Sequence, residues 1–244
     1  MAITRAVLLA AGKGTRLAPL TLHTPKPLLP VAGRPLIEHI IVGLREAGIG
    51  EFLCVIGHLG EQIQQCFGDG SCLGIRMEYV WQVDAPGTGG ALRLGRDFAE
   101  AGPVLMSFGD ILTDYAHYRA VLGDYDASPC AAVMGINPME DVSTGAAVLR
   151  NGSRVVGITE KPRPNEATSN WNQAGVTVFG SEIWPVLEQL PPSARGEYEI
   201  TTAIAMLIAQ GKEVRAVEFR GFWSDVGTPQ ALADADKRWP RTSS

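Results

Sequence analysis

A short apolar run that leads into a basic, glycine-rich loop constrains the fold of this chain more than any other feature. Residues 3–10 are apolar except for Thr4 and Arg5, and Ala11-Gly12-Lys13-Gly14-Thr15-Arg16 follows. Such a run, ending in small residues, is typical of a buried strand in a parallel sheet. Residues 1–37 hold five basic side chains and no acidic one, although the whole chain has a net charge of −5. We therefore expect a local anion site directly after this strand.

The loop has the chemistry of a phosphate site. Gly12 and Gly14 allow backbone angles that other residues resist, so their N–H groups can point at phosphate oxygens. Thr15 adds a hydroxyl donor and Arg16 a permanently charged, planar fork. The Gly-x-x-x-x-Gly-Lys-Ser/Thr spacing of P-loop proteins is absent, and Leu17 stands where the dinucleotide fingerprint has its third glycine. The expected ligand is a nucleoside triphosphate.

Lys26 is the next basic residue after the loop, and it lies between two prolines. Pro25 and Pro27 restrict the backbone on either side of it. A lysine held rigidly beside a phosphate loop suits electrostatic catalysis. The alternative is a solvated loop lysine.

Residues 9–21 and 24–36 together resemble the signature of the sugar-1-phosphate nucleotidylyltransferases, also called NDP-sugar pyrophosphorylases. Residues 22–27 are especially similar to short uridylyltransferases acting on N-acetylmuramate-1-phosphate, and glucose-1-phosphate uridylyl- or thymidylyltransferases fit about as well. The resemblance implies that Arg16 and Lys26 are catalytic. It also implies nucleotide contacts from Leu9, Ala10, Ala11, Gly12, Lys13, Gly14, Thr15 and Arg16.

Strands and helices alternate through the first half of the chain, which predicts an α/β fold with a doubly wound, Rossmann-like, mostly parallel sheet. Strands are expected at 3–10, 52–56, 75–81 and 104–108, and helices at 35–48, 60–67 and 88–99. After residue 125 the pattern changes. Strands are expected at 130–136, 146–149, 155–158, 174–179 and 214–219, and helices at 181–190, 198–210 and 229–237.

The second half reads as an inserted sugar-binding β subdomain within one domain. Asn151-Gly152 between two of its strands is a strong hairpin signal. With 244 residues, 45% of them hydrophobic, the chain can bury one sizeable core. We expect a single nucleotidyltransferase domain over 1–244. Its nucleotide-binding half covers about 1–125, its sugar-phosphate-binding half about 126–228, and a short C-terminal helix 229–239.

Gln82 follows a predicted strand, where doubly wound sheets bind ligands. An amide presents a donor and an acceptor together, so it can read the edge of uracil or thymine. In the family that the chain resembles, a glutamine with a glycine five residues later contacts a pyrimidine base. Gln82 and Gly87 have this spacing, and the resemblance implies that they and the following Thr88 contact the nucleotide. UTP or dTTP is therefore expected, and a solvated loop glutamine is the alternative.

Two aspartates suggest a magnesium site. Asp110 ends an apolar strand, where its side chain points into the ligand crevice. Asp225 lies in Trp-Ser-Asp-Val-Gly, and the resemblance implies that it and Asp110 hold Mg²⁺. Two carboxylates plus phosphate oxygens suit this cation, which prefers oxygen ligands. Asp225 could instead cap the last helix, although Thr228 is the better cap candidate.

The resemblance also implies sugar-phosphate contacts in the second half. Lys161 would bind the sugar phosphate, Glu160 would accept hydrogen bonds from sugar hydroxyls, and Gly145 would let the backbone approach the sugar. The family often has Asn directly before Ala-Gly on the next strand. Here Asn172 stands one position earlier, so Gln173 is the alternative contact.

The expected function is Mg²⁺-dependent transfer of a nucleotidyl group from UTP or dTTP to a sugar-1-phosphate, releasing pyrophosphate. A mannose-1-phosphate guanylyltransferase or a cytidylyltransferase for a non-sugar phosphate is the enzyme alternative. An inactive subunit that senses nucleotides or sugar nucleotides is the alternative of a different class. The presence of all the charged motif residues favours an enzyme. These residues are Arg16, Lys26, Asp110, Lys161 and Asp225.

The composition argues against some classes of partner and of location. The acidic balance and the few aromatic residues argue against a nucleic-acid partner. No apolar run approaches the roughly 20 residues that cross a membrane, and the start lacks the pattern of a signal peptide. We expect a cytoplasmic protein, monomeric or a small homo-oligomer, that makes nucleotide sugars for cell-envelope polysaccharide.

Overall fold

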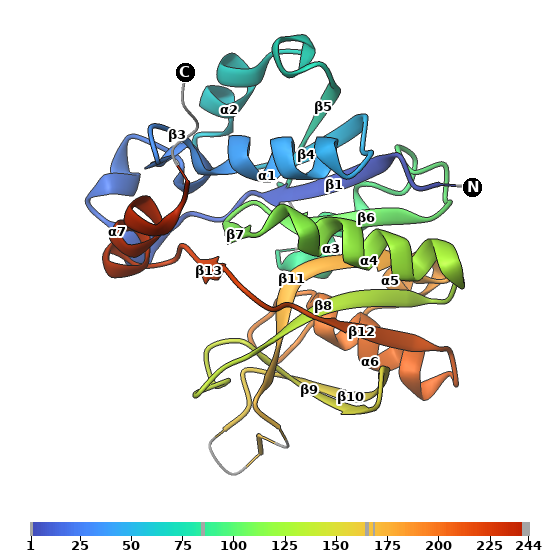
Figure 1. Cartoon of the computed structure of the whole chain (residues 1–244). Helices are drawn as coiled ribbons and strands as arrows, with labels where there is room; N and C mark the ends of the chain where they lie inside the picture. The colour runs from blue at the N-terminus through green and yellow to red at the C-terminus, as the bar shows by residue number, and fades with distance from the viewer. Residues whose placement is uncertain (1, 84–85, 164–165, 168, 241–244) are drawn as a thin grey trace.

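The computed structural model describes residues 2–83, 86–163, 166–167 and 169–240. Within them, one sheet of nine strands runs through the molecule in the order β5-β4-β1-β6-β11-β8-β12-β10-β9 (Figure 1). The four strands from the first half are β1 (Arg5–Ala10), β4 (Glu51–Ile56), β5 (Arg76–Trp81) and β6 (Val104–Phe108). The five from the second half are β8 (Ala132–Pro138), β9 (Ala146–Asn151), β10 (Arg154–Glu160), β11 (Trp171–Phe179) and β12 (Val214–Glu218).

Helices cover both faces of this sheet (Figure 1). They are α1 (Leu36–Glu46), α2 (Gly60–Phe67), α3 (Thr88–Arg93), α4 (Tyr115–Ala127), α5 (Ile183–Glu188) and α6 (Ile200–Ala209). A further helix, α7 (Pro229–Arg238), lies to the side of the sheet and packs on two small ribbons. These two ribbons complete the fold: β2 (Pro30–Val31) with β3 (Arg34–Pro35), and β7 (Ile111–Thr113) with β13 (Trp223–Asp225). Single turns of 3-10 helix span Thr15–Leu17, Leu20–Leu22, Lys26–Leu28 and Ser71–Leu73.

The parallel first half confirms the predicted fold class. β1 pairs in parallel with both β4 and β6, and β4 pairs in parallel with β5. Successive side chains of a strand point to opposite faces, so the apolar run of β1 serves two cores. Leu8 packs on the α1 and α4 side, Val7 packs on the α3, α5 and α6 side, and both are fully buried. The buried run in the sequence is explained by helices on both faces.

The second half continues the same sheet with mixed pairing. β11 is antiparallel to β6 and to β8, so it joins strands of both halves. β9 and β10 form an antiparallel hairpin with Gly152 at φ 60°, as the Asn-Gly pair predicted. Among the described residues, no helix combines the length and the apolar content that crossing a membrane requires.

Helix α4 is the α-helix that was not predicted from the sequence, and the short strands β2, β3, β7 and β13 were not predicted either. The buried positions of α4 are held by His117, Tyr118, Val121, Leu122 and Tyr125, so only two of them are aliphatic. The buried imidazole of His117 is satisfied by the Thr113 hydroxyl at Nδ1 (2.6 Å) and by a backbone carbonyl at Nε2 (2.8 Å). A helix whose core face is polar and aromatic gives a weak aliphatic period. Helix α3 also ends earlier than expected, at Arg93 instead of residue 99.

We expect Gly135→Ala to destabilise the fold. A Cβ at Gly135 would lie 2.1 Å from Cζ of the buried Phe219 ring, which stacks on His117. Overpacking of this kind costs about 1–3 kcal/mol. Urea unfolding should show a lower midpoint with an unchanged slope. Gly123→Ala is the matched control, because Gly123 lies exposed in α4 and no atom lies within 4 Å of the place that its Cβ would take. It should raise the midpoint slightly.

Candidate functional site

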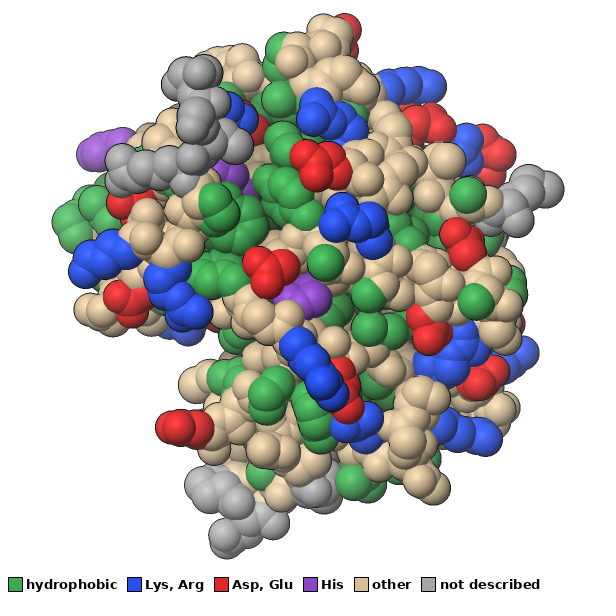
Figure 2. Space-filling view, in the orientation of Figure 1, with side chains coloured by type: hydrophobic (Ala, Val, Ile, Leu, Met, Phe, Trp, Pro, Cys, Tyr) green, Lys and Arg blue, Asp and Glu red, His purple; other side chains and the backbone are tan. Residues whose placement is uncertain are grey.

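A cleft of about 1060 Å³ opens where the parallel strands end. The space-filling view shows the molecule notched between the part that carries α7 and the part that carries β9 and β10 (Figure 2). Residues of both halves of the chain line the cleft. Those expected from the sequence are Leu9, Ala11, Gly12, Lys13, Arg16, Gln82, Gly87, Thr88, Asp110, Gly145, Glu160, Lys161, Asn172 and Asp225.

The glycine loop lies at one end of the cleft, directly after β1. Gly14 has the left-handed backbone that the sequence predicted, at φ 63°, whereas Gly12 does not need a left-handed angle. A Cβ at Gly14 would lie 3.0 Å from both Thr21 Cγ2 and Lys26 Cβ, so the loop packs closely on the lysine. Of the expected residues, Ala10, Gly14, Thr15 and Lys26 are absent from those that line the cleft. Thr15 is exposed, and Ala10 is buried.

Lys26 is buried, with 6% of its surface exposed, so the solvated-loop alternative is wrong. Its Nζ lies 2.6 Å from Oδ2 of Asp110 and 3.4 Å from Oδ1 of Asp225. Arg16 Nη2 lies 3.6 Å from the other oxygen of Asp225. Two carboxylates that line the cleft therefore meet two cations, of which Arg16 also lines the cleft and Lys26 lies buried beside it. The protein itself therefore holds these four charged groups close together.

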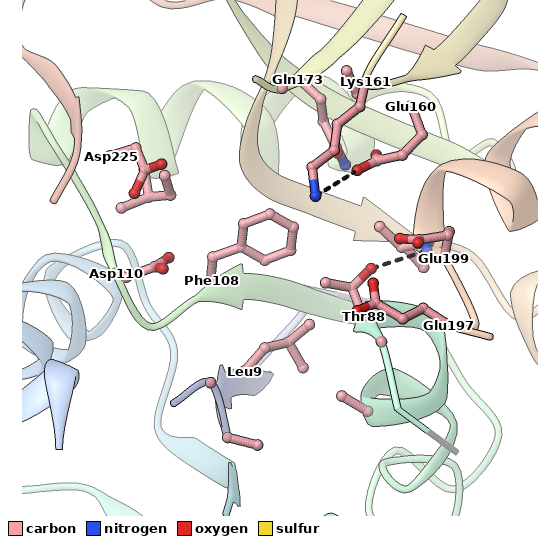
Figure 3. A pocket seen from close by; sticks show the side chains of 18 of the residues that line it. Leu9, Thr88, Phe108, Asp110, Glu160, Lys161, Gln173, Glu197, Glu199 and Asp225 are labelled. Carbon is pink, nitrogen blue, oxygen red and sulfur yellow. Dashed lines mark hydrogen bonds and ion pairs between the residues drawn. The ribbon is translucent and has the colours of Figure 1, made fainter. Parts of the chain in front are cut away.

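The ribbon of β7 and β13 brings the two aspartates together. Asp225 pairs with Ile111, the neighbour of Asp110, and the Val226 N–H donates to the Asp110 carbonyl at 3.0 Å. Figure 3 shows both carboxylates on the same side of the cleft. The cap of α7 is Thr228, whose Oγ1 accepts from the Ala231 N–H at 3.2 Å. The alternative capping role for Asp225 is therefore wrong.

The loop after β5 is anchored at both of its described ends. The Gln82 N–H donates to the Ile56 carbonyl at 2.9 Å, and Nε2 of Gln82 donates to the Gly87 carbonyl at 3.0 Å. Gly87 has φ 104°, and a Cβ there would lie 2.6 Å from the Tyr198 carbonyl oxygen. Only glycine fits this approach. The amide of Gln82 is thus held at the cleft by the glycine that the sequence spacing linked to it.

Glu160 and Lys161 lie on the opposite wall, at the end of β10 (Figure 3). Lys161 Nζ lies 3.8 Å from Glu160 Oε1. Lys161 has φ 41°, a strained backbone for a residue with a side chain, and such strain is concentrated at functional sites. Burial raises the pKa of Glu160, and the neighbouring carboxylate of Glu199 raises it further. Oε2 of Glu160 accepts from the Thr201 hydroxyl at 3.2 Å.

Asn172 was expected to contact the sugar, with Gln173 as the alternative, and the structure places the two amides differently. Asn172 Oδ1 accepts from the Ala146 N–H at 3.1 Å, and its Nδ2 donates to Asn137 Oδ1 and to the Gln173 carbonyl. These bonds occupy the Asn172 amide within the protein. Gln173 also lines the cleft, and among the described residues its buried Nε2 has no hydrogen-bond partner. The structure therefore favours Gln173 as the amide that meets a ligand.

A bulge in β11 helps to explain this placement. The register with β8 shifts between Gln173 and Thr177, and Gly175 between them has φ 79°. Bulges beside active sites often redirect a side chain. A Cβ at Gly175 would also lie 2.7 Å from Ile111. The sequence displaces Asn by one position, and the bulge lies directly after the displaced pair.

Arg195 is a residue of the site that gave no usable signal in the sequence. Arg195 Nη2 lies 2.7 Å from Glu199 Oε1 and 3.5 Å from Glu160 Oε1, so it joins two carboxylates of this wall. Nothing in the sequence spacing around Arg195 marks it as a site residue. His58 and Trp223 line the cleft, as do Phe108, Ile111, Met139, Thr144, Ser224, Glu197 and Glu199.

Known proteins resemble this chain over nearly all of its length. Residues 5–241 match the family described as "Nucleotidyl transferase". The "Bifunctional protein GlmU" of Methanococcus maripaludis is 34% identical over 96% of this chain and 54% of its own length. The "Glucose-1-phosphate thymidylyltransferase" of Streptomyces griseus is 32% identical over 96% of this chain and 65% of its own length. The chain thus spans about half to two thirds of these relatives.

A solved structure agrees with the fold over its full length. It is described as a putative glucose-1-phosphate thymidylyltransferase from Bacillus anthracis in complex with a sucrose. The TM-score is 0.88 at 28% identity, and the match covers 98% of this chain and 96% of that one. Both halves of the cleft therefore lie within the shared fold.

Proposed function

The chain belongs to the nucleotidyl transferase family, and from this premise we propose that it transfers a nucleotidyl group from UTP or dTTP to a sugar-1-phosphate. The products are an NDP-sugar and pyrophosphate. The observation that carries the proposal is the cleft itself. One cavity holds the glycine loop with Arg16, the carboxylate pair beside Lys26, and a facing wall with Lys161. The names of the thymidylyltransferase relatives support a pyrimidine nucleotide.

The reaction needs alignment and charge neutralisation more than acid–base chemistry. A sugar-1-phosphate oxygen attacks the α-phosphorus, a new P–O bond forms, and the bond to the bridging oxygen of pyrophosphate breaks. The attacking phosphate is largely a dianion at neutral pH, since its second pKa is about 6. No general base is required. The enzyme must hold two anions in line and offset their repulsion.

The side chains on the two walls suit these tasks. Lys13 and Arg16 are exposed at the nucleotide end, where they would bind the leaving pyrophosphate. Lys26 would stabilise charge at the α-phosphate from below the cleft. Lys161 would hold the attacking phosphate, and the neighbouring Glu160 would accept hydrogen bonds from sugar hydroxyls. Losing one such contact typically costs about 10²–10³ in rate.

Asp110 and Asp225 fit a magnesium ion. They present carboxylate oxygens to the cleft, with 34% and 40% of their side chains exposed. Among the described residues, no group of three acidic, histidine or cysteine side chains could hold a metal alone. A two-carboxylate site would therefore share its ion with phosphate oxygens, which is how Mg²⁺ usually binds. When bound, the ion would neutralise charge on the reacting phosphates.

The test is pyrophosphate release with Mg²⁺ over a matrix of substrates. UTP, dTTP, CTP, GTP and ATP are each paired with glucose-, mannose-, N-acetylglucosamine- and N-acetylmuramate-1-phosphate. We expect pyrophosphate release only with UTP or dTTP. The sugar-1-phosphate that gives release identifies the sugar. Release with GTP would contradict the role of Gln82 while preserving the reaction class. No release in any well, with nucleotide binding still detectable, would favour the sensing subunit.

A further inference from the structure

The start of helix α6 is fastened to the loop that leads into α3. The Tyr198 N–H donates to the Pro86 carbonyl at 2.7 Å, and the Tyr198 carbonyl accepts from the Gly89 N–H at 2.7 Å. The Ile200 N–H donates to Oγ1 of Thr88 at 3.0 Å. Figure 3 shows Thr88 beside Glu197 and Glu199. Two segments more than 100 residues apart in the sequence are thus joined by hydrogen bonds.

Thr88 acts as a cap for a helix other than its own. It is the first residue of α3, yet its hydroxyl oxygen accepts from the first N–H of α6. The first N–H groups of a helix have no partner within it, and threonine oxygens are favoured partners. The N-cap residue of α6, Glu199, supplies no side-chain cap of its own. Thr88 therefore fixes the place at which α6 begins.

The first turn of α6 supports the wall that faces the nucleotide loop. The Thr201 hydroxyl donates to Glu160 at 3.2 Å. Glu199 is 5% exposed, and Arg195 bridges it to Glu160. A shift of this turn would displace both carboxylates of the acceptor side. The hydrogen bond of Thr88 thus controls groups that lie on the opposite side of the cleft from the glycine loop.

We propose that Thr88 is a positioning residue for the acceptor site, acting through Ile200 to hold residues 197–201 against Glu160. This inference rests on the proposed function and differs from the nucleotide contact that the resemblance implied. It predicts that losing the hydroxyl affects the sugar phosphate much more than the nucleotide.

Thr88→Val removes the hydroxyl oxygen that accepts the hydrogen bond from Ile200 but keeps the branched shape of the side chain. A buried N–H left without a partner is unfavourable, and a tenfold change in an equilibrium constant corresponds to about 1.4 kcal/mol. We expect the KM for the active sugar-1-phosphate to rise about tenfold. The dissociation constant of UTP or dTTP, measured by calorimetric titration in the absence of sugar-1-phosphate, should stay within about twofold of the wild-type value. Thr88→Ser should restore the KM. Weaker nucleotide binding with an unchanged acceptor KM would overturn the inference.

Amide hydrogen exchange gives a readout that needs no turnover. In Thr88→Val, residues 198–203 should exchange faster, whereas Thr202→Val should leave them unchanged. Thr202 lies in the same helix and takes no part in these hydrogen bonds. Unchanged exchange in Thr88→Val would refute the link even if the enzyme is active. If Thr88→Val does not fold, Thr88→Ala serves for both measurements. A wild-type protein inactive with every substrate pair would instead refute the proposed function.

Discussion

Replacing Lys26 by methionine should lower turnover by about 10²–10³ while leaving the fold intact. Lys26 Nζ is held close to both aspartates, at 2.6 Å from Asp110 and 3.4 Å from Asp225. Methionine fills a similar space without charge, so the loss reports on electrostatics. The fold should survive because both carboxylates face the open cleft, where water can solvate them. Single-turnover rates with saturating substrates measure the effect, and thermal unfolding checks the fold.

A control variant and a metal-binding measurement accompany the Lys26→Met variant. Lys212→Met, at an exposed turn after α6, should leave turnover unchanged. In the nucleotide-free protein, Lys26→Met should bind Mn²⁺ more tightly than the wild type, because the lysine no longer competes for the carboxylates. Turnover like that of the wild type would remove Lys26 from the catalytic machinery. Loss of turnover together with loss of the folded state would mean that the lysine is structural.

Most of the first half of the fold could be predicted because three of its four strands in the main sheet, β1, β4 and β6, are buried on both faces. The continuous apolar run of β1 is the direct consequence of cores on either side, in which Val7 and Leu8 point in opposite directions. The same reasoning could not find α4, since its core face uses His117, Tyr118 and Tyr125. These side chains are buried only because partners elsewhere satisfy or cover them. These contacts come from other parts of the fold, and they leave no helical repeat of apolar residues in the sequence.

The site could be predicted where a local motif also fixes local geometry. Gly14, with its left-handed backbone, and Gly87, pressed against Tyr198, are such positions. Arg195 could not be predicted, because its role depends on α6 and β10 meeting at Glu199 and Glu160. The choice between two neighbouring amides depended on a bulge in β11 and on hydrogen bonds from other strands. Sequence spacing alone does not encode either.

Asp225→Asn should raise the Mg²⁺ concentration needed for half-maximal activity about tenfold or more. An amide offers Mg²⁺ one neutral oxygen where the carboxylate offers charge, and this hard cation depends on charged oxygen ligands. The change also alters the electrostatics of Arg16 and Lys26, which lie 3.6 Å and 3.4 Å from the Asp225 oxygens. Turnover at saturating Mg²⁺ should therefore fall as well, by about 10². Activity over a Mg²⁺ titration measures both effects.

Asp234→Asn is the matched control for this substitution. Asp234 is an exposed carboxylate on α7, where it accepts hydrogen bonds from Gln230 at 3.0 Å, and it is not among the residues that line the cleft. Its Mg²⁺ titration should match that of the wild type. If Asp225→Asn gave the same titration as this control, Asp225 would not be a metal ligand. A fall in turnover at every Mg²⁺ concentration, without a shift in the midpoint, would assign Asp225 to holding Lys26 and Arg16 in place. The titration thus separates a carboxylate that binds the metal from one that only orients the cations beside it.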